Sequence, residues 1–217
     1  MKYQGFARFR FPARALPLMA VLATPVAADG RGGAHSTPES ESAPLGGDSP
    51  SHSVFVYAGQ WSANRLGEIL TTRTNFRSSY LVAAGLSGVL HGFSEHLHLE
   101  GEINAAQHWG KQHHLEINAA ASLRWRTFPW DHYLDTSFAH GLGPSYAFER
   151  PPIESRRDQR ASRVLVFMMT ELAFAPPQAS YTAWEGFIRI HHRSGAYDVV
   201  SKASGSNFVT FGLRHRF

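Results

Sequence analysis

The chain has 217 residues and no cysteine, which excludes a disulfide framework and a thiolate metal site. Its 21 basic and 17 acidic residues give a formal net charge of +4. Four basic residues and no acidic one lie in the first 28 positions, so the remainder of the chain carries 17 of each kind. Without a basic footprint on that remainder, we expect no nucleic-acid partner.

The N-terminus has the three parts of a secretory signal peptide. Lys2 and three arginines precede an apolar stretch, residues 15–26, which ends in small residues. We expect cleavage after Ala28. A short transmembrane anchor is the alternative, but a membrane-spanning helix needs about 20 apolar residues. Pro17 and Pro25 interrupt this run.

Three regions follow from composition. Residues 1–28 are the predicted signal peptide. Residues 29–52 are rich in Gly, Ser and Pro and nearly lack large apolar groups, which predicts a disordered periplasmic leader. The rest, 53–217, has the length of one domain.

Polar and apolar residues alternate with a period of two through this domain, which is the pattern of β-strands. The alternation is clearest at 96–106 and 114–125, where the polar parity includes Glu100, Glu102 and Glu116. Further strands are predicted at 54–61, 79–89, 133–142, 163–174, 181–194 and 206–217. The total of eight is even, as closed single-chain bacterial barrels require.

The alternation fits two architectures, a soluble barrel or sandwich with an apolar interior and a membrane barrel with a polar one. The signal peptide favours the membrane barrel. The predicted strand lengths also favour it, because they are near the roughly 9 to 11 residues that a tilted strand needs to cross a bilayer. Aromatic residues at segment ends, such as Trp61, Trp109 and Trp125, also favour it. We therefore predict an all-β, eight-stranded antiparallel transmembrane β-barrel in the outer membrane, with its polar parity inside.

Connection lengths predict the orientation of this barrel. With a periplasmic N-terminus, the short connections after the second, fourth and sixth strands face the periplasm, as such barrels prefer. The connections after the first, fifth and seventh strands are longer and would be external, and only 108–113 is a short external loop. The segment 148–162 carries two prolines and a charged run, which predicts a solvated, mobile external loop.

The last predicted strand places Phe211, Leu213, His215 and Phe217 at every second position. A terminal Phe that closes an alternating strand resembles the assembly signal of outer-membrane barrels. The resemblance implies the barrel assembly machinery as a partner.

Candidate chemistry lies near the end of the seventh predicted strand. His192 and Ser194 are two positions apart, so they share a strand face, where a base and a nucleophile could meet. Their parity also carries Trp184 and Ile188, which marks it as the lipid-facing side. The strand runs outward, so the pair would lie in the outer leaflet, where lipopolysaccharide sits. His191 has the opposite parity and points into the barrel.

The sequence HHRSGAYDVVSKASGSNFVTFGLRHRF resembles the C-terminal end of lipid A 3-O-deacylases (PagL) and acyloxyacyl-hydrolase-like outer-membrane barrels, over roughly the last 30 residues. The resemblance implies that Ser194 is the nucleophile that attacks an acyl ester of lipid A and that His192 is its general base. It implies neither a metal nor a cofactor.

Two positions depart from the family pattern. The catalytic carboxylate of the family falls by spacing at Asn207, and Gly195 replaces the Asn that follows the serine. Asn207 can orient an imidazole, as in Cys-His-Asn enzymes, but it stabilises an imidazolium less well than a carboxylate does. Asp198 is an alternative carboxylate from the following loop.

Other functions stay open at this stage. A catalytically silent structural or adhesive barrel fits the same strands, whereas a channel is disfavoured because side chains fill an eight-stranded interior. The row of His and Glu residues at 96–102 and 114–116 has metal-ligand types. We expect it to be the hydrogen-bonded filling of the barrel instead. The sequence predicts no oligomeric state.

Overall fold

The computed structural model describes residues 51–217 apart from 72, 156–160, 178–182, 197–199 and 201–204. The predicted signal peptide, nearly all of the predicted leader and Asp198 lie outside these residues. Within the described part, no helix has the length and apolar character needed to cross a membrane.

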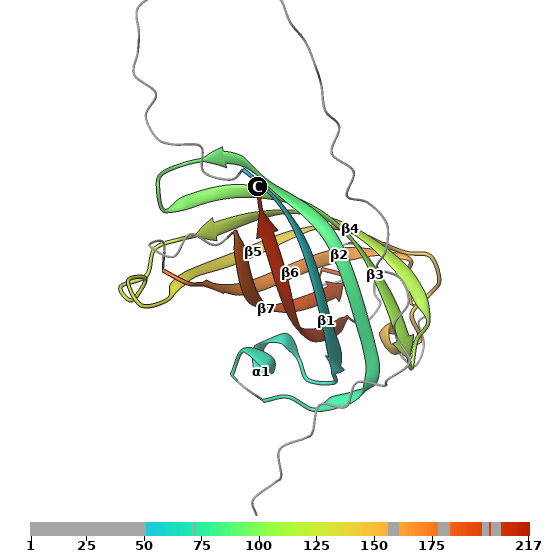
Figure 1. The fold of residues 1–217 in the computed structure, drawn as a ribbon. Coiled ribbons are helices and arrows are strands. Elements are labelled where there is room, and N and C mark those ends of the chain that lie inside the picture. Colours follow the sequence, from blue (N-terminus) through green and yellow to red (C-terminus); the bar gives the residue numbers. More distant parts are fainter. Residues whose placement is uncertain (1–50, 72, 156–160, 178–182, 197–199, 201–204) are drawn as a thin grey trace, which may run out of the picture. The chain divides into compact units, whose positions relative to one another are not determined.

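Eight strands of the described chain form one closed antiparallel barrel in which sequence neighbours pair (Figure 1). The strands are β1 (His52–Ser62), β2 (Phe76–Gly92), β3 (Leu97–Gly110), β4 (His114–Trp125), β5 (Asp135–Ala147), β6 (Val164–Ala175), β7 (Trp184–Ser194) and β8 (Ser206–Arg216). The first and last strands close the sheet, where the His52 N–H donates to the Phe217 carbonyl at 3.2 Å and the Phe217 N–H to the His52 carbonyl at 2.9 Å. The predicted eight-stranded barrel is confirmed.

Most predicted strand ranges agree with the observed ones to within a few residues. The main difference is β5, which continues through Gly141, Gly143 and Pro144. A Cβ at Gly141 or Gly143 would lie 2.5 or 2.2 Å from a backbone oxygen of β4. This close approach, rather than a turn, accounts for the glycines, and it could not be recognised from the sequence alone.

The barrel has a polar interior and an apolar exterior. Glu102 and Glu116 are 6% and 0% exposed, whereas Ile103 and Ile117, one position further along, are 60% and 46% exposed. The predicted placement of the polar parity inside the barrel is therefore confirmed. This is the arrangement of a barrel that crosses a bilayer.

Buried ion pairs fill much of the interior. Arg189 donates to both oxygens of Glu102 at 2.9 Å and to Glu171 at 2.8 Å. Arg214 contacts both oxygens of the same Glu171 at 2.8 and 2.9 Å. Because each buried carboxylate has such partners, the charges are satisfied without water. Within the predicted polar row, Glu100 and Glu102 are thus hydrogen-bonded filling of the barrel, whereas His98 Nδ1 and both ring nitrogens of His114 are buried without a hydrogen-bond partner among the described residues.

Two short helices lie in connections at the end of the barrel where β1, β3, β5 and β7 end, which we call the Ser194 end. The helix α1 (Leu66–Leu70) follows β1, and the 3-10 helix η1 (Pro152–Glu154) follows β5. Glu154 is fully buried and receives two contacts from Arg193 Nη1, at 2.9 and 3.0 Å. The prediction of a solvated, mobile external loop at 148–162 is therefore wrong at Glu154, because this side chain is buried and hydrogen-bonded to a barrel arginine; residues 156–160 of the loop lie outside the described residues.

Candidate functional site

The candidate site lies on the outer surface of the barrel at the Ser194 end. His192 and Ser194 share the outward face of β7 with Ile188, which is 41% exposed, whereas Arg189 is fully buried inside. The strand register places His192 opposite Asn207 of β8 and Ser194 opposite Val166 of β6. The predicted lipid-facing side of the pair agrees with this arrangement.

His192 and Asn207 are joined by a short hydrogen bond. Their Nδ1 and Oδ1 atoms are 2.6 Å apart, and the amide nitrogen of Asn207 donates to the carbonyl of Asn64 at 2.9 Å. The second bond fixes the amide orientation, because only the NH2 group can donate to a carbonyl. His192 therefore carries its proton on Nδ1 and donates it to Asn207. Its Nε2 is left as the acceptor that a general base needs.

Asn64 belongs to the β1–β2 connection and is held by α1. Its side chain donates to Glu68 Oε2 at 3.2 Å, while the same carboxylate oxygen accepts the Arg65 N–H at 2.9 Å. This capping of the helix start positions the carbonyl that orients Asn207. The role of Asn64 could not be predicted from the sequence, because its contact depends on closure of the barrel between β1 and β8.

Ser194 lies at the start of a tight turn. Its Oγ accepts the Ala196 N–H at 3.4 Å, and Ala196 has a φ of 51°, in the left-handed region. Among the hydrogen bonds of the described residues, none joins Ser194 to His192. Both side chains border Gly205, because a Cβ added there would lie 3.2 Å from His192 Cε1 and 3.3 Å from Ser194 Cβ. Catalytic hydrogen bonds of this kind are often made only with substrate present.

Glu154 accepts hydrogen bonds from Arg193 and Ser206, two inward-facing residues that are adjacent to the site residues in sequence. Arg193 lies between His192 and Ser194, and Ser206 directly precedes Asn207. Glu154 Oε1 accepts from Ser206 Oγ at 2.7 Å as well as from Arg193. Burial raises the pKa of Glu154 to about 7, against the opposing effect of the Arg193 guanidinium.

An apolar groove of about 610 Å³ crosses the outer surface of β2 to β6. Small residues, among them Ala105 and Ala119, hollow it between the larger Ile103, Ile117 and Tyr146. The rows of paired residues connect it to the candidate site, since Ser194 pairs with Val166 and Val166 with the groove residue Pro144. Beyond Pro144 the groove continues over Ala119, which pairs with Ile103, and Ile103 pairs with Leu86.

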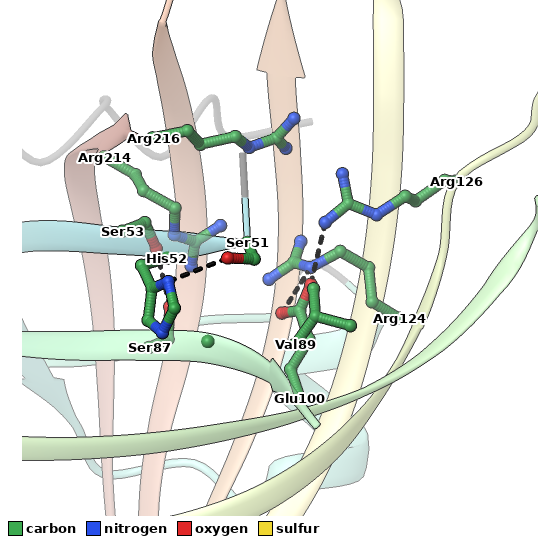
Figure 2. A pocket seen from close by; sticks show the side chains of 11 residues that line it. Ser51, His52, Ser53, Ser87, Val89, Glu100, Arg124, Arg126, Arg214 and Arg216 are labelled. Atoms are coloured by element: carbon green, nitrogen blue, oxygen red, sulfur yellow. Dashed lines mark hydrogen bonds and ion pairs between the residues drawn. The ribbon is translucent and has the colours of Figure 1, made fainter. Parts of the chain in front are cut away.

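The opposite end of the barrel holds a small polar pocket. Figure 2 shows Arg124, Arg126, Arg214 and Arg216 around Glu100. Arg124 and Arg126 donate to the two oxygens of Glu100 at 2.8 and 2.9 Å. Because these guanidinium groups are already paired with a carboxylate, the pocket belongs to the ion-pair filling of the barrel.

A closed eight-stranded antiparallel barrel with an apolar outer surface defines the chain as a barrel of the outer-membrane type. The crystal structure of the outer membrane enzyme PagL is similar, with a TM-score of 0.52 over 76% of this chain and 99% of that chain. The two sequences are 12% identical, so the likeness is one of fold. No family model matches the chain, and no curated protein matches it in sequence.

Proposed function

We propose that the chain is an outer-membrane ester hydrolase that removes an ester-linked acyl chain from lipid A. The observation that carries this proposal is the hydrogen-bonded series from Asn64 through Asn207 to His192, which leaves His192 Nε2 as a base two residues from Ser194. The fold shared with PagL, an outer membrane enzyme, supports it.

The proposed reaction is acyl transfer to Ser194. His192 Nε2 removes the hydroxyl proton as Oγ attacks the ester carbonyl, and the imidazolium then protonates the departing sugar oxygen. Water, deprotonated by the same imidazole, attacks the acyl carbonyl, and the imidazolium returns the proton to Ser194 Oγ as the bond from Oγ to the acyl group breaks and the fatty acid is released. Asn207 holds the tautomer, and its neutral amide stabilises the imidazolium less than a carboxylate would. These steps require neither a metal nor a cofactor.

The position of the site favours a lipid substrate. Ser194 is the last residue of β7, whereas the groove residues Ile103 and Leu86 lie near the middle of β3 and β2. The path from Ser194 to these residues therefore descends from the end of the barrel toward the middle of the apolar surface. An acyl chain whose carbonyl lies at Ser194 would follow it into the bilayer. With the N-terminus periplasmic, this end of the barrel lies in the outer leaflet, beside lipopolysaccharide.

The test is the mass of lipid A from Gram-negative cells that express the chain. The native protein should lower the mass of lipid A by one acyl chain. The Ser194→Ala barrel should assemble equally well but leave this mass unchanged, because the nucleophile is lost. Ser87→Ala is the matched control, since Ser87 Oγ bonds to Ser53 at the opposite end of the barrel, at 2.7 Å. An unchanged mass with the native protein, or equal activity of Ser194→Ala, would favour the catalytically silent barrel.

A further inference from the structure

A cluster of metal-ligand side chains lies inside the barrel, behind the candidate site. His108 of β3, Glu116 of β4 and His191 of β7 are at most 1% exposed, and one ligand atom from each lies within 4.8 Å of the other two. Glu116 is 3.1 Å from His108 Nε2 and 2.9 Å from His191 Nε2. We propose that these three residues bind a structural divalent metal ion, of which Zn²⁺ fits the ligand set best.

The ligand types and spacing suit zinc. Zinc binds imidazole nitrogen and carboxylate oxygen at about 2.0 to 2.2 Å, so its tetrahedral donors lie about 3.3 to 3.6 Å apart. His108 Nε2 lies 3.1 Å from Glu116 Oε2 and His191 Nε2 lies 2.9 Å from Glu116 Oε1, which is close to that spacing, and the three ligand atoms all lie within 4.8 Å of one another. Movement of the two imidazoles toward a common point would admit the ion.

Each histidine has a partner on its far nitrogen, as metal-binding histidines do. His191 Nδ1 lies 2.9 Å from the Tyr57 hydroxyl, and His108 Nδ1 lies 3.0 Å from Gln112 Nε2. Both Nε2 atoms therefore point at Glu116. In the described structure Gln112 Oε1 is buried without a hydrogen-bond partner. Turning this amide over places Oε1 on the His108 Nδ1–H, which is the tautomer that binds a metal through Nε2.

His114 supplies a second, independent observation. Its side chain is 1% exposed, and neither ring nitrogen has a hydrogen-bond partner among the described residues. Buried polar atoms without partners are rare in proteins, and each one needs an explanation. The His114 ring stacks on His108 at 4.3 Å, and its Nε2 lies 3.7 Å from Glu116 Oε2. Rotation of this ring away from the stack, toward Glu116, would make it the fourth ligand of a closed site.

The ligand cluster adjoins the buried pair of Glu154 and Arg193. Arg193 Nε lies 3.4 Å from Glu116, and its Nη1 lies 2.9 Å from Glu154. A metal ion held by His108, Glu116 and His191 would crosslink β3, β4 and β7. A proton on one imidazole is the competing partner of the Glu116 carboxylate.

The test uses Co²⁺ as a spectroscopic substitute for zinc. The barrel, refolded in detergent with the metal and then washed with chelator, should retain about one ion per chain, with the visible spectrum of a four-coordinate cobalt site. The His191→Gln variant should retain at least about ten-fold less metal per chain than the native protein. His140→Gln should keep it, because His140 is on the outer surface of the barrel, bonded to Thr170.

The cobalt spectrum of the native protein tests the proposed site even if a variant fails to fold. Retention of less than a tenth of an equivalent, roughly, or a six-coordinate spectrum that survives in His191→Gln, would overturn the site. The first result would leave a protonated imidazole as the counter-charge. Neither measurement depends on esterase activity, so failure of this proposal and failure of the proposed function are separate results.

Discussion

At the scale of single residues, Asn207 has two tasks that a carboxylate could not combine. Its oxygen accepts from His192, and its nitrogen donates to the Asn64 carbonyl. A Glu in this place could accept the first bond but would face the carbonyl oxygen with another acceptor. The β1–β2 connection is therefore matched to an amide at position 207. The local structure thus accommodates an amide at this position.

We predict that Asn207→Leu lowers the rate constant of deacylation by about 100-fold or more with little change in substrate binding, because His192 loses the acceptor that selects its tautomer. The measurement is single-turnover release of fatty acid from purified lipid A. Val209→Ala, the next outward position on β8, is the control and should retain activity. Equal rates for Asn207→Leu and the native protein would show that Asn207 does not position His192.

At the scale of elements, η1 connects a loop to two strands of the site. Glu154 reaches into the barrel and pairs with Arg193 on β7 and Ser206 on β8. The folded protein holds the Glu154 proton more tightly than the unfolded chain does, because burial raises its pKa from an ordinary value near 4.5 to about 7. The stability that this proton contributes is present below pH 4.5 and is lost as the pH rises to about 7.

We predict that Glu154→Gln removes this part of the pH dependence of stability. The native protein should lose up to about 3 kcal/mol from this group between pH 4.5 and pH 7, and the variant should not. Urea unfolding of both proteins across this pH range measures the difference between their free energies of unfolding. The contributions of the other titrating groups are common to both proteins and cancel in this difference. Glu149→Gln, at an exposed position of the same loop, should follow the native curve. Parallel curves for Glu154→Gln and the native protein would contradict the prediction.

At the scale of the whole molecule, the barrel with its polar interior and apolar exterior explains which features could be predicted from the sequence. Parity follows directly from the period of a strand, so the inward side of Glu102 and the outward side of His192 were predictable. The pairing of Glu154 with Arg193 was not, because the two residues are 39 positions apart and meet only in the closed barrel. The same holds for the carbonyl of Asn64. Contacts of this kind depend on loop conformation, which leaves no periodic signal.

We predict that Ile103→Arg costs about 2 to 4 kcal/mol of stability in lipid vesicles, because it places a charge in the middle of the outward face of β3. Ile103 is 60% exposed, so the same change would cost little on a barrel in water. Leu70→Arg is the control, because Leu70 is 58% exposed in α1, outside the strands. A cost below about 0.5 kcal/mol for Ile103→Arg would argue against a membrane-embedded surface.

The seam between β1 and β8 has a consequence for the order of strands along the chain. It is hydrogen-bonded like the other junctions, and the Phe217 ring stacks on His52 with ring centroids 6.3 Å apart. The closed sheet therefore has no first strand in any physical sense, and a circularly permuted chain that begins at another hairpin would encode the same set of neighbours. In such a permutant Phe217 would be internal. Its packing at the seam would then be separated from any role that it has as the terminal residue.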